Sequence, residues 1–207
     1  ADITVHGKSA FGARPWLGIN AIDKANKLIH KIRDLNETLK SIRHPILNPP
    51  SIMVAIIEGG QATNIVPDYC KVTVTRRLLP GETKEECLKE FQDIFDQLKK
   101  EDPEFEATLN IRDGFRPPAE VSKDTVVCQA VAKAHKLIRG EDLAFVGSEG
   151  GTDASHVVNQ IKLPMPVYGP GEDHRIGMID ECIKLDDVVD AVKVYALTIY
   201  YTMGLQA

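Results

Sequence analysis

The side chains of this 207-residue chain that could bind a metal are scattered along the sequence. Six histidines stand at positions 6, 30, 44, 135, 156 and 174, and none of them forms H-x-H, H-E-x-x-H or another compact ligand pair. The four cysteines, at positions 70, 87, 128 and 182, include no C-x-x-C pair. We therefore expect neither a compact zinc motif nor a tight disulfide framework, and we interpret the cysteines as reduced, mostly packed thiols.

Two glycine-rich stretches are better candidates for a binding site. The first, GSEGGTDAS at 147–155, follows an apolar run and leads into a predicted helix. Gly150 and Gly151 allow the backbone to approach a ligand closely, and the free N–H groups of a helix N-terminus attract an anion. Thr152 or Asp153 could instead serve only to cap the helix, and the sequence leaves both interpretations open.

The second stretch, GPGEDHRIGMIDE at 169–181, contains a single histidine, His174. It also follows an apolar run, and open α/β sheets place their ligands at the carboxyl ends of their strands. Two such loops side by side therefore predict a site. His174 is either a metal ligand in it or an exposed loop histidine. Asn64, in an earlier polar loop, is a weaker candidate that rests on the tendency of loops to carry binding residues.

The first half of the chain has the sequence pattern of a two-layer α/β domain. Alternating apolar and polar residues predict strands at 2–7, 51–60, 68–80 and 105–113, and helical spacing predicts a helix within 18–39. Thr83 and Glu86 form a capping box, which predicts that a second helix begins after Thr83. The order βαββαβ indicates a ferredoxin-like fold.

A boundary is predicted at Pro117 and Pro118, which separates a domain at 1–115 from a segment at 116–207. The second segment alternates predicted helices, at 126–137 and from Asp186 to about Met203, with short apolar strands at 143–147 and 165–169. This alternation is typical of a parallel α/β sheet, which needs more strands than these. We expect an incomplete half-domain, completed by another chain or by more of the same polypeptide.

Four motifs, in order, resemble those of one family. They are GKSAFGARPWLGINAI at 7–22, GGQATNIVPDYCKVTVTRRLLPGET at 59–83, EGGTDAS at 149–155, and the VYGPG and IDECI stretches at 167–183. The chain resembles the zinc peptidases and amidohydrolases that include acetylornithine deacetylase, succinyl-diaminopimelate desuccinylase, aminoacylase and glutamate carboxypeptidase. The resemblance implies that 1–115 is a lid domain that forms a homodimer, and that 116–207 is the C-terminal half of a catalytic domain.

The resemblance also implies which side chains act and which are missing. Members of the family hold two Zn²⁺ ions, but most of their ligands and their general base lie in a first half that these residues do not include. Phe11 and Gly177 stand where the family usually has histidines, and His174 is a displaced candidate for the second of them. The positions that match the family's substrate-binding motifs are Asn64, Arg77, Gly150, Gly151, Thr152 and Asp153.

Two functions follow as expectations. The chain is either a portion of a metal-dependent amidohydrolase or peptidase that is inactive as given, or a non-catalytic dimerisation or amino-acid-binding regulatory protein of the same descent. Its partners would be a second copy and either a missing N-terminal half or a full-length paralogue; whether it holds zinc itself is left open. The formal charge of -5 comes from interspersed acids and bases, which argues against nucleic acid. The absence of a long apolar run or a signal peptide predicts a cytoplasmic protein that does not enter membranes.

Overall fold

The computed structural model describes residues 1–112, 115–171 and 175–204. The chain divides into two compact units, Ala1–Pro118 and Ala119–Ala207, which are described separately. Among the described residues, no helix is both long enough and apolar enough to cross a membrane.

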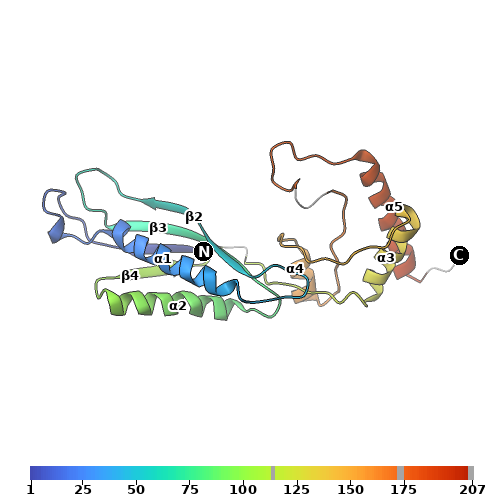
Figure 1. The fold of residues 1–207 in the computed structure, drawn as a ribbon, viewed down its shortest axis with the longest axis horizontal. Coiled ribbons are helices and arrows are strands. Elements are labelled where there is room, and N and C mark those ends of the chain that lie inside the picture. Colours follow the sequence, from blue (N-terminus) through green and yellow to red (C-terminus); the bar gives the residue numbers. More distant parts are fainter. Residues whose placement is uncertain (113–114, 172–174, 205–207) are drawn as a thin grey trace. The chain divides into compact units, whose positions relative to one another are not determined.

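The first unit has the predicted ferredoxin-like fold (Figure 1). Its elements are β1 (Asp2–His6), α1 (Ala21–Leu39), β2 (Ser51–Gly59), β3 (Tyr69–Arg77), α2 (Lys84–Glu101) and β4 (Glu106–Asn110). The strands form an antiparallel sheet in the order β2-β3-β1-β4, so the two strands that begin and end the chain's first unit are neighbours. The prediction of βαββαβ is confirmed.

Alternation along the strands decides which face of this sheet is buried. Ile3 and Val5 on β1, and Cys70, Val72 and Val74 on β3, point to the helix side and are almost completely buried. Every second residue of a strand faces the same way, so their polar neighbours lie on the other face. The buried stripe of α1 completes the core, and its members are Ala21, Ala25, Leu28, Ile32 and Leu39.

The helices of this unit begin at side-chain caps. Asn20 accepts a hydrogen bond from the backbone N–H of Ile22 at the start of α1. At α2, the backbone N–H of Glu86 donates to Thr83 Oγ1, and the backbone N–H of Thr83 donates to the Glu86 carboxylate. The predicted capping box is therefore present, and it satisfies two N–H groups at this terminus.

The sheet has two unlike edges. At one edge, β2 is nine residues long, carries a register shift between Val54 and Ile56, and exposes the apolar side chains of Met53, Ile56 and Ile57. At the other edge, β4 is five residues long, and Glu106 is exposed there.

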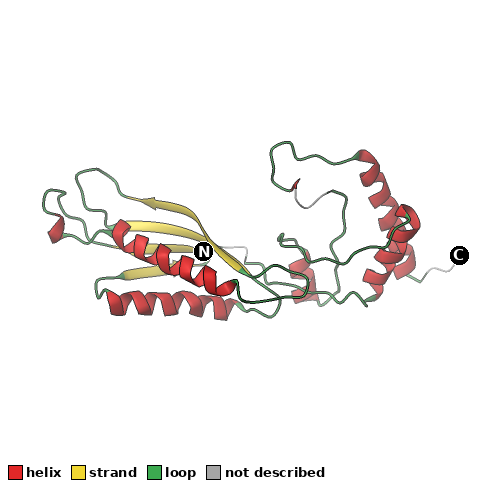
Figure 2. Cartoon of the chain, viewed as in Figure 1, coloured by secondary structure: helices red, strands yellow, loops and turns green. Residues whose placement is uncertain are grey.

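In the described residues of the second unit the regular secondary structure is helical, and long loops join the helices (Figure 2). It contains α3 (Val126–Arg139), the short α4 (Ala154–His156), a π-helical segment η2 (Val157–Ile161) and α5 (Leu185–Thr202). Helices α3 and α5 pack together around Val131, Ala134 and Val194. Gly140 ends α3 in the left-handed conformation, with φ +76°, as helix C-termini commonly require.

The strands predicted at 143–147 and 165–169 are wrong at the level of secondary structure, since neither segment pairs as a strand. Each instead contributes one side chain, Leu143 and Tyr168, to the packing around the α3–α5 core. A strand requires a hydrogen-bonded neighbour, and the two segments do not pair with each other. Their apolar sequence is consistent with a sheet that needs further strands.

Candidate functional site

The loop after β1 and the loop before β3 meet in a short antiparallel pairing at one end of the first unit. Gly12 N–H donates to the carbonyl of Asn64 at 2.7 Å, and Val66 N–H donates to the carbonyl of Ala10 at 2.8 Å. Phe11 and Ile65 therefore face each other across an isolated bridge. The structure thus brings together Phe11 and Asn64, which the sequence places in separate motifs.

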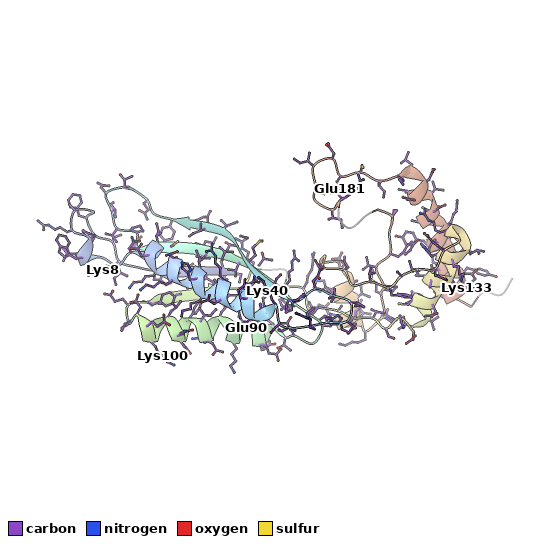
Figure 3. The ribbon with its side chains drawn as sticks, viewed as in Figure 1. Lys8, Lys40, Glu90, Lys100, Lys133 and Glu181 are labelled. Carbon is purple, nitrogen blue, oxygen red and sulfur yellow. The ribbon has the colours of Figure 1, made fainter. Side chains whose placement is uncertain are left out.

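Glycine is required where these loops touch. A Cβ on Gly12 would lie 2.9 Å from the carbonyl carbon and oxygen of Asn64, and a Cβ on Gly18 would lie 2.6 Å from the carbonyl oxygen of Lys8. Both contacts are with backbone, so they cannot be relieved by a side-chain rotation. Lys8, labelled in Figure 3, also exchanges two backbone hydrogen bonds with Ile19, which closes the loop at its base.

This loop end exposes large apolar side chains. Phe11 is 61% exposed and Trp16, in the short 3₁₀ helix η1 (Pro15–Leu17), is 75% exposed. A phenyl ring offers no hydrogen-bond donor, so Phe11 can contribute contact area but cannot polarise a carbonyl group. Asn64, the residue before Ile65, is exposed, and its side-chain amide can both donate and accept.

Arg77 does not belong to this cluster. It is the last residue of β3, opposite Ser51, whereas Asn64 lies before the first residue of that strand. A nine-residue strand separates the two ends by roughly 25 Å. Its neighbour Arg76 is nearly buried and pairs with Glu82 at 2.5 Å and Glu90 at 3.1 Å. Burial opposes the charge of Arg76, but hydrogen bonds to Glu90 and Glu82 outweigh it and raise its pKa.

In the second unit, Gly150, Gly151, Thr152 and Asp153 form the turn that leads into α4. Asp153 is the N-cap residue of α4 but makes no side-chain capping hydrogen bond, and Thr152 and Asp153 accept through their backbone carbonyls. Because α4 has only three residues, it offers little of the macrodipole that would attract an anion. The predicted anion site at this helix therefore gains no support.

The second candidate loop folds back on itself from residue 175 onward. Gly177 adopts φ +76°, and its N–H donates to the carboxylate of Glu181 at 2.9 Å (Figure 3 labels Glu181). Arg175 donates to the sulfur of Cys182 at 3.3 Å across the same turn. His174, the displaced candidate ligand, lies outside the described residues.

The described residues do not assemble a set of side-chain ligands that could bind zinc. Within 1–112, 115–171 and 175–204, no three or more histidine, cysteine, aspartate or glutamate side chains are grouped so that they could hold a metal ion. Structural zinc takes four protein ligands and catalytic zinc takes three. These residues alone do not fit the metal that the resemblance implies, so no chemical step is assigned to it here.

The comparisons with known proteins identify the class. Residues 1–103 match the family profile of the peptidase dimerisation domain of the M20 family. The first unit is therefore a peptidase dimerisation domain, and the earlier resemblance is confirmed.

Among curated relatives, acetylornithine deacetylase of Myxococcus xanthus is 26% identical over 207 residues, which cover 99% of this chain and 52% of that protein. The chain thus spans about half the length of the relatives it matches.

Two solved structures share the fold. Aminopeptidase PepT of Bacillus cereus superposes with a TM-score of 0.71 at 23% identity, over 98% of this chain and 51% of that one. The M20 family metallo-carboxypeptidase Sso-CP2 of Sulfolobus solfataricus gives 0.69 at 16% identity, over 99% and 58%. At this level of identity the likeness establishes the fold, which extends over both units.

Sequence reasoning missed one polar cluster in the second unit. His135 Nδ1 lies 2.9 Å from the hydroxyl of Tyr168, and the hydroxyl of Tyr195 donates to the backbone carbonyl of Tyr168 at 2.6 Å. These three residues are far apart in the sequence and form no motif. Only the position of Tyr168, directly before the glycine-rich stretch at 169–171, could have drawn attention to it.

Proposed function

We propose that this chain provides the dimerisation domain and the C-terminal part of the catalytic domain of a metal-dependent amidohydrolase or peptidase. The reaction of the whole enzyme would be hydrolysis of an N-acyl amino acid or of a C-terminal peptide bond. One observation carries the proposal: the match to acetylornithine deacetylase runs through both units, over 99% of the chain, and not only through the dimerisation domain.

In this proposal the metal ions, zinc by the resemblance, are held by residues that these 207 do not include. By the same resemblance, Asn64 of the dimerisation domain and Gly150 to Asp153 of the second unit would each bind substrate in the whole enzyme. The pairing of the two loops that carry Phe11 and Asn64 brings both residues to one end of the first unit, which supports a binding site there. Cytoplasmic localisation stays a prediction of the sequence.

The test compares this chain with a polypeptide extended upstream by the first half of an acetylornithine deacetylase such as that of Myxococcus xanthus. Each is loaded with Zn²⁺, its bound metal is counted by mass spectrometry, and hydrolysis of N-acetylated and N-succinylated amino acids is measured. We expect no bound zinc and no turnover for the 207 residues alone. Stoichiometric zinc binding with turnover by the chain alone would contradict the proposal.

A second candidate function is a non-catalytic dimerisation or amino-acid-binding protein. Phe11 favours it, because a phenyl ring at this exposed position cannot stabilise a developing oxyanion, and losing such a donor costs about 10²–10³ in rate. An extended polypeptide that binds an amino acid by calorimetry, but neither binds zinc nor hydrolyses any substrate, would select this function. Turnover by that polypeptide would exclude it.

Self-association through the dimerisation domain is also part of the proposal. The β2 edge presents unpaired backbone groups beside the exposed side chains of Met53, Ile56 and Ile57, and an exposed apolar edge strand is a template for pairing with another chain. We propose that two copies pair along β2 and continue one sheet across the dimer.

A lysine at the β2 edge should break this dimer. We expect Ile57→Lys to raise the dimer dissociation constant at least tenfold in analytical ultracentrifugation, because the charge would be buried on pairing. Glu106→Lys, which changes an exposed residue of the opposite edge strand, is the control and should leave the constant unchanged. Equal dissociation constants for the two variants would place the dimer interface elsewhere.

A further inference from the structure

The residue that precedes the Gly169–Gly171 turn is held from two helices at once. Tyr168 lies against His135 of α3 and Tyr195 of α5, with ring centroids 5.8 Å and 5.9 Å away and ring planes nearly perpendicular, at 79° and 83°. Edge-to-face contacts of this kind stabilise aromatic pairs beyond the area that they bury. The phenol of Tyr168 also packs against the small core between α3 and α5.

Two hydrogen bonds hold Tyr168, one at its backbone carbonyl and one at its side-chain hydroxyl. The hydroxyl of Tyr195 donates to the backbone carbonyl of Tyr168 at 2.6 Å, directly before Gly169. At the other end, the hydroxyl of Tyr168 lies 2.9 Å from His135 Nδ1. The backbone carbonyl of Tyr168 is thus hydrogen-bonded to α5, and its side-chain hydroxyl is hydrogen-bonded to α3.

The direction of the second bond follows from what surrounds the imidazole. His135 Nε2 faces the carboxylate of Glu141 at 3.8 Å, which favours a proton on that nitrogen. Nδ1 is then the acceptor, and Tyr168 is the donor. Burial raises the pKa of Tyr168, so that its hydroxyl keeps the proton that it donates.

We infer that His135 and Tyr195 are positioning residues that hold, through Tyr168, the Gly169–Pro170–Gly171 turn at the start of the second candidate loop. This turn needs an external anchor, because Gly169 and Gly171 restrict the backbone little and Gly171 adopts φ +112°. The role of the turn in an active site rests on the proposed function. The anchor itself is a property of the second unit.

Nuclear magnetic resonance on the full chain tests the anchor directly. In Tyr195→Phe, the backbone order parameter of Gly169 should fall from about 0.85 toward about 0.6, because the carbonyl before it loses its donor. In Tyr168→Phe, the ¹⁵N resonance of His135 Nδ1, recorded at about pH 8, should move to that of an acceptor without a partner. The matched control is Tyr200→Phe, which removes a hydroxyl from the same helix and should change neither quantity.

Two substitutions of His135 separate positioning from packing. His135→Asn keeps an acceptor near the position of Nδ1 and should preserve the order of Gly169, whereas His135→Leu keeps bulk but no acceptor and should lower it. Equal order parameters in these two variants, or an effect of Tyr200→Phe as large as that of Tyr195→Phe, would overturn the inference. None of these readouts depends on catalysis, so the anchor can stand even where the hydrolase proposal fails, and the reverse holds too.

Discussion

The two units of this chain differ in how much of a core each one builds for itself. The first closes a four-stranded sheet and two helices around side chains that are almost fully buried, among them Ile3, Leu28, Val72 and Phe105. The second gathers its core cluster from Val131, Ala134 and Val194, and it leaves Leu185, Val192 and Ile199 of α5 exposed. The dimerisation domain is therefore a complete folding unit, while the second unit has apolar surface that it does not bury in its described part.

Separating the units should give the largest effect. Residues 1–118, expressed alone, should keep a cooperative thermal transition, because their core is internal. Residues 119–207, expressed alone, should show none, because a cluster of this size cannot offset the conformational entropy of folding. Differential scanning calorimetry of both pieces is the measurement. A sharp transition from residues 119–207 would show that the second unit also folds on its own.

Cavities made in the two cores should have unequal consequences. Leu28→Ala removes a completely buried side chain of α1 and should lower the free energy of unfolding by about 2–5 kcal/mol in urea denaturation. Val194→Ala alters an equally buried residue of α5 but should leave that same transition unchanged, since it belongs to the other unit. A shift of the main transition by Val194→Ala would show that the two units unfold together.

The ion pairs of Asp102 should make the first unit sensitive to acid. Hydrogen bonds from Lys24 and Lys27 lower the pKa of Asp102 to about 2, and Lys24 Nζ lies 2.7 Å from its carboxylate. Because the folded-state pKa lies below the unfolded one, this stabilisation is present above about pH 4 and is lost as the pH falls toward 2. Asp102→Asn should therefore cost about 2 kcal/mol at pH 7 and flatten the stability profile between pH 4 and 2.

The control for that experiment is Asp93→Asn, an exposed position on α2. It should shift stability by less than about 0.5 kcal/mol and leave the acid dependence of the parent chain in place. A parent profile that is flat between pH 4 and 2 would mean that the lysines do not hold this carboxylate in solution.

Helix caps should give the smallest difference between the units. Thr83→Ala removes the hydrogen bond that Thr83 Oγ1 accepts from the backbone N–H of Glu86, and should cost about 1 kcal/mol in the transition of the first unit. Thr125→Ala alters the equivalent position of α3, where the threonine makes no side-chain capping hydrogen bond, and should cost less. Helix content by circular dichroism and urea midpoints would compare the two, and equal losses would remove the distinction between the caps.

The fold of the first unit could be predicted from the sequence because the patterns that indicate its helices and strands are local and agree with one another. Strand alternation around Val72, helical spacing around Leu28 and the Thr83 capping box each require only neighbouring residues. Once those elements exist in the order βαββαβ, few compact topologies remain, and the observed sheet is one of them.

The second unit and the site could be predicted less well, because their contacts are not local. The apolar runs at 143–147 and 165–169 predicted strands, yet a strand depends on a neighbour that no local pattern supplies. Likewise, the pairing of Phe11 with Ile65 and the contact of His135 with Tyr168 join residues from distant parts of the sequence. The sequence identified the candidate residues, but it could not predict which of them would lie close together in the structure.

The short β4 edge bears on how large an assembly of this protein could become. Pairing of β2 with β2 about a two-fold axis would use the long apolar edge of both copies and leave β4 at the two outer ends of the joint sheet. A five-residue edge that exposes a carboxylate is a poor template for a further strand. Growth would then stop at a closed pair instead of continuing into a fibre, so solubility at high concentration would depend on β4 staying short and polar.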